Sequence, residues 1–186
     1  MTGVPSPPSP FIEGRFGAWL IPGNIGKSVA EMARAFGMEI LIAARPGGAT
    51  PPPDRIPLAR LLSEADIISL HCPLTAATNR LINAQALERM KPSAFLINTA
   101  RGALIDEAAL IDALKQRRIA GAAVDVISQE PPTANHPMVL AAKTLPNLIV
   151  TPHTAWSARE ARDRLLTEVA ANITSFLNGQ ERNLVR

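Results

Sequence analysis

The sequence predicts an α/β protein built on a doubly wound parallel sheet. Short apolar runs of strand type alternate with segments of helical period along most of the chain. A glycine turn lies between the first strand-like run and the first helical segment. This order is that of a βαβ unit, which implies parallel strands and a right-handed crossover. With 186 residues, 47% of them hydrophobic and 19% charged, the chain can form one domain with a sizeable core.

The composition excludes several classes of function. The net charge is only +3, no basic run stands out and aromatic residues make up 4%, so we expect no nucleic-acid partner. The one cysteine, Cys72, permits no internal disulfide and suits a reducing compartment. One Cys and three separated His give no zinc-ligand spacing, so we expect no metal. Without a bilayer-length apolar run or a signal-peptide core, we expect a cytoplasmic protein with no membrane partner.

The first strand and helix follow a proline-rich leader, residues 1–13, which we expect to be flexible. Residues 16–21 are apolar enough for a buried strand. The first helix is predicted for residues 25–36, and Gly37 is placed to end it. Four residues at helical spacing should form its buried face: Val29, Met32, Ala33 and Phe36.

The middle of the chain continues the alternation of strand and helix. Further strands are predicted for residues 39–43, 67–70, 94–97, 119–124 and 148–150. Further helices are predicted for residues 57–65, 83–90 and 106–117, and a long proline-bearing loop precedes the last strand. Together these elements predict a dinucleotide-binding domain over residues 14–156.

A C-terminal helix and tail, residues 157–186, complete the predicted organisation. The helix should span residues 157–178, with Ser157 and Glu160 at capping-box spacing and Gly179 as its stop. Six apolar residues form one stripe along this helix: Leu165, Leu166, Val169, Ile173, Phe176 and Leu177.

The glycine turn has most of a dinucleotide-binding fingerprint. In G-x-G-x-x-G the glycines turn the chain tightly and bring it close to a pyrophosphate, which the helix N-terminus then holds. Gly23 and Gly26 fill the second and third glycine positions, whereas Ile21, followed by Pro22, fills the first. An isoleucine cannot easily adopt a positive φ. The turn therefore predicts a Rossmann-type nucleotide site in which the first glycine position binds the nucleotide less well.

The end of the second strand bears on which cofactor would bind. An acidic residue commonly holds the adenosine ribose at this position. The chain has Ala44 there instead, followed by Arg45. Arg45 could pair with the 2′-phosphate of NADP, or it could simply be a solvated charge in a loop. The sequence leaves both interpretations open.

Three polar residues follow the ends of three predicted strands. Arg101 follows the strand at 94–97, Glu130 the strand ending near residue 124, and His153 the strand at 148–150. The carboxyl ends of parallel strands share one edge of a sheet, so these side chains should gather there. A carboxylate beside an imidazole keeps a proton available for transfer, and an arginine can bind a carboxylate in bidentate fashion. Each residue alone could be structural, but the set predicts acid/base chemistry on an acidic substrate.

Five motifs resemble, in order and spacing, the D-isomer-specific 2-hydroxyacid dehydrogenases. They are Pro22-Gly-Asn-Ile-Gly26, Leu70-His-Cys-Pro-Leu-Thr75, Ile97-Asn-Thr-Ala-Arg-Gly102, Val124-Asp-Val126 with Glu130-Pro131, and Thr151-Pro-His153. The resemblance covers about residues 14–183. Two further segments are most similar to the glycerate dehydrogenase (hydroxypyruvate reductase) branch: Ala44-Arg-Pro-Gly47 and His153-Thr-Ala-Trp-Ser-Ala-Arg-Glu160.

The resemblance implies roles for individual residues. Arg101 would orient the substrate carboxylate and carbonyl, His153 would be the acid/base, and Glu130 its partner. Asp125 would hold the nicotinamide carboxamide. The implied cofactor, NAD or NADP with NADP weakly favoured by Ala44 and Arg45, would contact a set of residues at the turns: Gly23, Asn24, Ile25, Gly26, Ala44, Arg45, Cys72, Pro73, Thr78, Thr99, Ala100, Asp125 and His153.

The resemblance also implies a substrate and a missing part. The substrate would be a small 2-oxo or 2-hydroxy acid, such as hydroxypyruvate, glyoxylate or glycerate. Family members begin with a substrate domain, for which this chain has almost no room before its first predicted strand. Two readings therefore stand: an NAD(P)-dependent reductase, or a truncated nucleotide-binding module that is catalytically silent. A homo-oligomer or a separately supplied substrate domain would be the partner.

Overall fold

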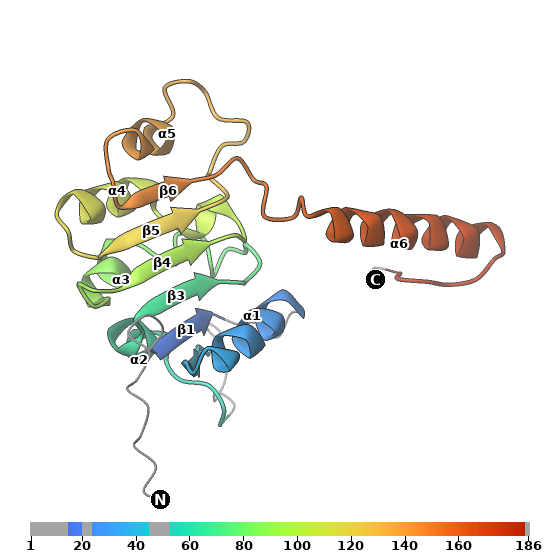
Figure 1. The fold of residues 1–186 in the computed structure, drawn as a ribbon, viewed down its shortest axis with the longest axis horizontal. Helices are drawn as coiled ribbons and strands as arrows, with labels where there is room; N and C mark the ends of the chain where they lie inside the picture. The colour runs from blue at the N-terminus through green and yellow to red at the C-terminus, as the bar shows by residue number, and fades with distance from the viewer. Residues whose placement is uncertain (1–14, 20–23, 45–52, 185–186) are drawn as a thin grey trace, which may run out of the picture. The chain divides into compact units, whose positions relative to one another are not determined.

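In the computed structural model, the described residues are 15–19 (backbone course only), 24–44 and 53–184. They contain one six-stranded sheet in the order β2-β1-β3-β4-β5-β6, and every neighbouring pair is parallel (Figure 1). The strands are β1 Arg15–Trp19, β2 Glu39–Ile42, β3 Ile67–Leu70, β4 Phe95–Asn98, β5 Gly121–Val124 and β6 Leu148–Val150. The predicted doubly wound α/β sheet is confirmed.

Helices connect successive strands. They are α1 Asn24–Ala35, α2 Leu58–Glu64, α3 Ala84–Arg89, the 3-10 turn η1 Gly102–Leu104, α4 Glu107–Lys115, α5 Pro137–Ala142 and α6 Arg159–Leu177. The predictions for β3 and β6 match residue for residue, and most other ends differ by one or two residues. Residues 20 and 21, which we assigned to the first strand, lie outside the described part of the chain.

The order of the strands reverses at β1. The chain passes from β1 to β2 on one side and then returns to place β3 on the other, pairing Trp19 with Leu70. In an open α/β sheet, the crevice outside the carboxyl ends of the two strands at such a reversal is where ligands bind. The topology therefore predicts a ligand site between the start of α1 and the segment after β3.

Each face of the sheet has its own apolar core. Leu41 and Ala43 belong to the large core formed with α2, α3, α4 and α5, whereas Ile40 and Ile42 pack with Ala30 and Ala33 of α1. The alternation follows from the two-residue period of a strand. Over β4 and β6 the second face retains exposed apolar side chains, with Phe95 50% and Ile149 61% exposed.

The buried face of α1 differs from the prediction. Gly26, Ala30 and Ala33 are its buried residues, whereas Met32 and Phe36 are exposed. Small residues spaced by four and three positions allow the helix backbone to lie close to β1 and β2, and this rotates the larger side chains outward. The prediction for the end of the helix is confirmed, because Gly37 has a φ of +82°.

Helix α5 lies inside the stretch that we predicted to be a loop. Pro137 occupies its first turn, where a missing N–H costs nothing, and Nδ1 of the buried His136 accepts a hydrogen bond from the Met138 N–H at 3.3 Å. Met138 and Ala141 are buried in the large core. Proline at the first helical turn starts this helix, which is why a reading of proline as a breaker missed it.

The chain divides into two compact units, and the second begins at His153. Within the second unit, α6 is capped by Ala158 without a side-chain hydrogen bond, so the predicted Ser157–Glu160 capping box is wrong. The Ser157 hydroxyl instead donates to the Thr154 carbonyl at 2.7 Å. The predicted stop is confirmed, because Gly179 has a φ of +67°. Within the described part of the chain, no helix has the length and apolar character needed to cross a membrane.

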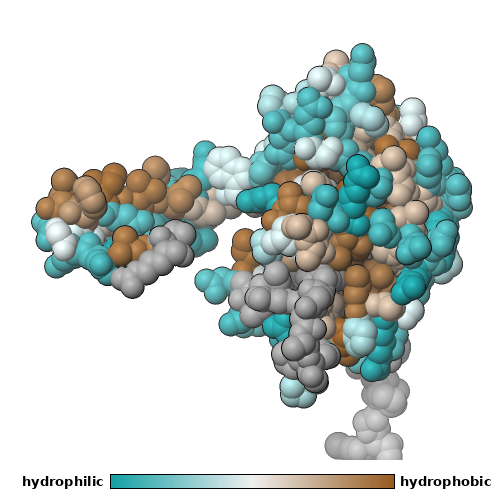
Figure 2. Space-filling model, turned by 180° about the vertical axis from the view of Figure 1, so that it is seen from behind, coloured by the Kyte–Doolittle hydropathy of each residue, from teal (hydrophilic) through white to brown (hydrophobic). Residues whose placement is uncertain are grey.

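No residue of α6 is buried. The six apolar side chains of the predicted stripe are 46% to 82% exposed, and Figure 2 shows apolar side chains gathered along one side of this helix. The tail folds back on the polar side of the helix: Arg182 donates to Glu168 at 2.5 Å and to Asn172 at 2.9 Å.

Candidate active site at the carboxyl edge of the sheet

Asn98, the last residue of β4, fixes the loop that carries Arg101. Its side chain is fully buried; Nδ2 donates to the Arg101 carbonyl at 2.9 Å, and Oδ1 accepts from the Ala100 N–H at 3.0 Å. One amide therefore satisfies two backbone groups of the turn. The Arg101 side chain is exposed, and Nη1 donates to the Ala100 carbonyl at 2.6 Å. Thr99 is exposed and Ala100 half-buried on the same turn.

Gly102 brings this loop into backbone contact with the loop after β5. A Cβ at Gly102 would lie 2.0 Å from the carbonyl carbon of Ile127 and 2.4 Å from the amide nitrogen of Ser128. Only glycine permits so close an approach. The segments that bear Arg101 and Glu130, 29 residues apart in the sequence, are therefore brought together at this edge of the sheet.

Glu130 and Glu107 secure the second loop. Oε1 of Glu130 accepts from the Ile127 N–H at 2.9 Å. Glu107, in the first turn of α4, accepts from the Ser128 N–H at 2.6 Å and from the Ser128 hydroxyl at 2.9 Å. Nε2 of the buried His136 lies 3.7 Å from the same carboxylate. Glu107 thus connects α4 to both ends of the loop that carries Glu130.

Asp125 follows β5 and is almost fully buried. Its N–H donates to the Asn98 carbonyl at 2.9 Å, and its carboxylate accepts a short hydrogen bond from the Thr151 hydroxyl. A buried carboxylate requires such partners. Asp125 therefore connects the carboxyl ends of β4, β5 and β6.

The end of β3 and the segment after it contribute neutral groups. The Ser69 hydroxyl and Nε2 of His71 lie 2.9 Å apart, and burial lowers the pKa of His71, so the imidazole is neutral at pH 7. Burial raises the pKa of the Cys72 thiol to about 11, so the thiol stays protonated. The buried Thr78 hydroxyl donates to the carbonyl of the exposed Pro73 at 2.8 Å and holds the loop between them.

The start of α1 has the charge that a phosphate requires. Its first turn carries no acidic residue, Asn24 and Ile25 are exposed, and Gly26 is buried. The partial positive charge of a helix N-terminus and its unpaired N–H groups favour an anion there. Ala44, half-buried beyond β2, has no side-chain acceptor for a ribose hydroxyl, while Gly23 and Arg45 lie outside the described residues. The first turn of α1 therefore fits the pyrophosphate of a dinucleotide.

His153 opens the second unit of the chain. It is exposed and has a φ of +54°, in the left-handed region that non-glycine residues seldom adopt. Its carbonyl accepts a hydrogen bond from the Trp156 indole at 2.8 Å. The three residues predicted to act together are therefore divided between the units, with Arg101 and Glu130 in the first and His153 in the second.

Sequence reasoning missed two residues that shape this site, Asn98 and Glu107. For Asn98 a signal was available, since a polar residue that ends a buried strand needs hydrogen-bond partners nearby. For Glu107 the sequence offered none, because its partner Ser128 is 21 positions away.

Comparison with known proteins identifies the family of this chain. A family model described as "D-isomer specific 2-hydroxyacid dehydrogenase, NAD binding domain" matches residues 20–155. The glycerate dehydrogenase of Methylorubrum extorquens is 45% identical over 163 residues, which are 88% of this chain and 50% of that protein. The hydroxypyruvate reductase of Blautia hydrogenotrophica is 37% identical over 166 residues, again 88% and 50%. The chain thus spans about half the length of the curated relatives it matches.

A solved structure is similar as well. An acyclic imino acid reductase in complex with NADPH and D-Arg is 35% identical, with a TM-score of 0.80 over 94% of this chain and 55% of that one. The family model covers well over half of the present chain, and the parallel α/β sheet is the fold expected of a dinucleotide-binding domain. The chain therefore belongs to the D-isomer-specific 2-hydroxyacid dehydrogenase family and comprises its NAD-binding domain.

Proposed function

We propose that this chain is the cofactor-binding part of an NAD(P)-dependent oxidoreductase that reduces a small 2-oxo acid, such as hydroxypyruvate or glyoxylate, to the D-2-hydroxy acid. The observation that carries the proposal is the backbone contact of Gly102 with residues 127 and 128. This contact sets the exposed cation Arg101 beside the loop of Glu130 at the carboxyl edge of the sheet. Family membership and the glycerate and hydroxypyruvate enzymes among the relatives support the substrate class.

The proposed chemistry assigns one task to each side chain. Bound NAD(P)H supplies the hydride. Arg101 binds the substrate carboxylate and stabilises the negative charge that develops on the C2 oxygen. His153 donates a proton to that oxygen, and Glu130 keeps the imidazole protonated for the transfer.

The proposed cofactor site consists of backbone turns and small side chains. The α1 N-terminus with Gly23, Asn24, Ile25 and Gly26 holds the pyrophosphate. Asp125 holds the nicotinamide carboxamide, and Cys72, Pro73, Thr78, Thr99 and Ala100 line the crevice between. Because Ala44 offers the ribose no acceptor and Arg45 offers a 2′-phosphate a donor, NADPH should bind at least as well as NADH. Calorimetry with both cofactors tests this, and a clear preference for NADH would count against Arg45 as the discriminating residue.

Turnover is best tested in a chimera, because the chain spans half the length of its relatives. The N-terminal half of the Methylorubrum glycerate dehydrogenase fused to this chain should oxidise NAD(P)H when hydroxypyruvate is added. Arg101→Ala and His153→Ala should each reduce the rate by roughly 10²-fold or more, and Arg162→Ala, an exposed control on α6, should not. Activity within tenfold of the parent for both variants would refute the assigned roles.

Glu130→Gln should move the pH–rate profile rather than abolish turnover. In the proposed reaction His153 gives up a proton and Glu130 is its partner, so loss of the Glu130 carboxylate should move the alkaline fall in rate to lower pH. The half-length match keeps a second function open, a nucleotide-binding module without turnover. That alternative predicts cofactor binding by calorimetry and no turnover in any chimera.

A further inference from the structure

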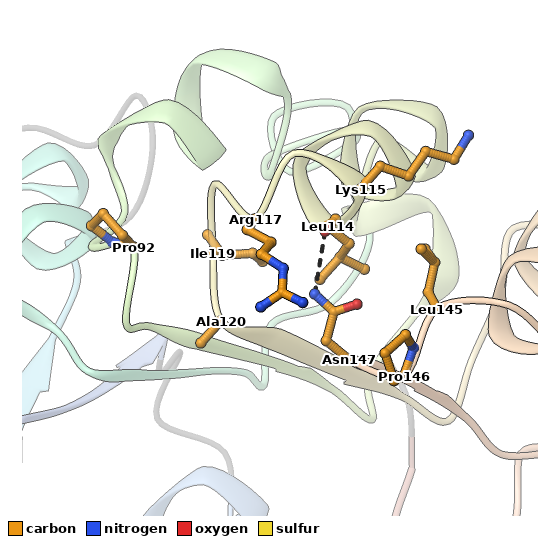
Figure 3. Close-up of a pocket in the computed structure, with 9 residues that line it drawn as sticks. All are labelled: Pro92, Leu114, Lys115, Arg117, Ile119, Ala120, Leu145, Pro146 and Asn147. Carbon is orange, nitrogen blue, oxygen red and sulfur yellow. Dashed lines mark hydrogen bonds between the residues drawn. The ribbon is translucent and has the colours of Figure 1, made fainter.

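A cavity of about 520 Å³ lies at the amino edge of the sheet, opposite the candidate active site (Figure 3). It is bounded by the end of α4 and by the segments that enter β4, β5 and β6. Its lining comprises Pro92, Leu114, Lys115, Arg117, Ile119, Ala120, Leu145, Pro146 and Asn147. Neither the family description nor the proposed reaction assigns this cavity a role.

The cavity has positive charge and a fixed amide donor. Two lining residues are cationic, Lys115 and Arg117, and none is acidic. Figure 3 shows the guanidinium of Arg117 and the side-chain amide of Asn147 turned toward each other. The Asn147 amide already donates to the Leu114 carbonyl at 3.3 Å, which holds it in place. A guanidinium beside a fixed amide donor suits a carboxylate or phosphate oxygen.

Arg117 lies in a backbone conformation that disfavours a side chain. Helix α4 ends with the Arg118 N–H donating to the Ala113 carbonyl at 2.8 Å and the Arg117 N–H donating to the Leu114 carbonyl at 3.1 Å, the paired bonds of a Schellman motif. Arg117 occupies the left-handed position of this motif, with a φ of +53°. A side chain is unfavourable in that conformation.

Two other helices of the same chain end in the same motif, and both have glycine at that position. In α1 it is Gly37, with the Met38 N–H donating to the Ala33 carbonyl at 3.1 Å. In α6 it is Gly179, with the Gln180 N–H donating to the Ser175 carbonyl at 2.8 Å. A cation near a helix C-terminus is favourable, but Lys115 in the last turn of α4 already supplies one without strain. The helix end therefore gives no reason of its own for Arg117.

We infer that this cavity binds a small organic anion, with its oxyanion on Arg117 and Asn147 and its apolar part against Pro92, Leu145 and Pro146, the lining residues that have accessible apolar surface. The walls supply the apolar contact, and the donors fix the orientation, as in small-molecule sites generally. The inference does not depend on the proposed reaction, because every residue named lies at the opposite edge of the sheet from Arg101.

Phenyl phosphate, which has an oxyanion on an apolar ring, is the probe. Titrated into the ¹⁵N-labelled chain, it should shift the NMR signals of Ala120 and the Asn147 side chain at millimolar concentrations. Inorganic phosphate and phenol should each bind more weakly, because each lacks one half of the match. Any binding at the nucleotide site would shift Gly26 and Ala44 instead, so the two sites are read separately.

Variants decide whether Arg117 is the anchor. Arg117→Gly restores the residue that the motif prefers, so it should fold, and it should weaken phenyl phosphate binding by about tenfold. Arg117→Lys, which keeps the charge but loses the planar guanidinium, should have an affinity between those of the parent and Arg117→Gly. Lys143→Ala removes an exposed cation outside the cavity and should change nothing. Unchanged affinity in Arg117→Gly, or no shift at Ala120 and Asn147 in the parent, would overturn the inference.

Discussion

At the scale of single residues, the candidate site depends on side chains that hold backbone rather than on those that would react. Asn98 connects the end of β4 to Ala100 and Arg101, and Glu107 connects α4 to Ser128. Asn98 is buried and Glu107 is nearly so. Both make hydrogen bonds to backbone groups of the loops. Arg101 can therefore remain exposed while its backbone is fixed, which suits the substrate-orienting role proposed for it.

Asn98→Ala should lower the free energy of unfolding by about 1–3 kcal/mol, because it leaves the Ala100 N–H without its partner and removes one of the two hydrogen bonds to the Arg101 carbonyl, which the Leu104 N–H also donates to. Urea denaturation monitored by circular dichroism measures this. Asn79→Ala, at an exposed asparagine, is the matched control and should stay within about 0.5 kcal/mol of the parent. Equal effects of the two substitutions would show that the Asn98 clamp is energetically unimportant.

Cys72 gives a prediction about pH. Burial raises the pKa of its thiol from a usual value of 9.0 to about 11, so the folded state holds the proton more tightly than the unfolded state. The corresponding stability is fully present below pH 9 and is lost as pH rises from 9 toward 11. The two-unit difference corresponds to at most about 3 kcal/mol. The fall in unfolding free energy over this window should be smaller in Cys72→Ala; identical slopes would show that the thiol does not contribute.

At the scale of elements, the fold positions its loops through close backbone approach. Parallel strands deliver their loops to one edge, but strand order alone leaves the loops separate. The contact of η1 at Gly102 with residues 127 and 128 joins the connection after β4 to the connection after β5. A glycine acts here through the absence of a Cβ, whereas at Gly37 it acts through a positive φ in open space.

The two glycines should therefore respond differently to alanine. Gly37→Ala introduces only backbone strain and should cost about 1–2 kcal/mol. Gly102→Ala places a methyl group within 2.1 Å of the Ile127 carbonyl group, so the two loops must separate or the domain must unfold. Thermal denaturation should show the larger loss for Gly102→Ala, with faster amide hydrogen exchange at Ser128. A smaller loss than that of Gly37→Ala would contradict the close contact.

At the scale of the whole molecule, two apolar surfaces lack cover within their own units. The stripe of α6 has no buried member, and the sheet exposes Phe95 and Ile149. Proteins seldom leave contiguous apolar surface exposed unless it is an interface. We propose that a substrate domain or a second copy of the chain covers such surface.

Purified alone, the chain should self-associate through the α6 stripe, because association removes that surface from water. Leu166→Glu with Phe176→Glu should lower the mass found by light scattering, since a charge on the stripe opposes its burial. Thr167→Glu, which adds a negative charge at an exposed position that faces away from the stripe, should leave the mass unchanged. A monomeric parent would show that the stripe does not mediate association.

The amino-acid sequence by itself determined the strands, most of the helices and the family. Buried strands such as Ile67–Leu70 are short apolar runs between turn residues, and Gly37 and Gly179 mark helix ends through their own conformational preference. These signals are local, because a strand or helix has a period of two or about four residues that any short window contains. The motifs of the glycine turn and the later loops are equally local, and they predicted the family that the comparisons confirm.

Only the tertiary structure decided which face each element buries and which distant groups meet. Helix α1 offered two apolar faces, and the closer approach allowed by Gly26, Ala30 and Ala33 selected one of them. Helix α5 buries Met138 and Ala141 in the large core, whose other residues come from distant parts of the sequence. Glu107 and Ser128 are neighbours only after the sheet has assembled. Such contacts depend on the spatial order of strands, and no local pattern encodes that order.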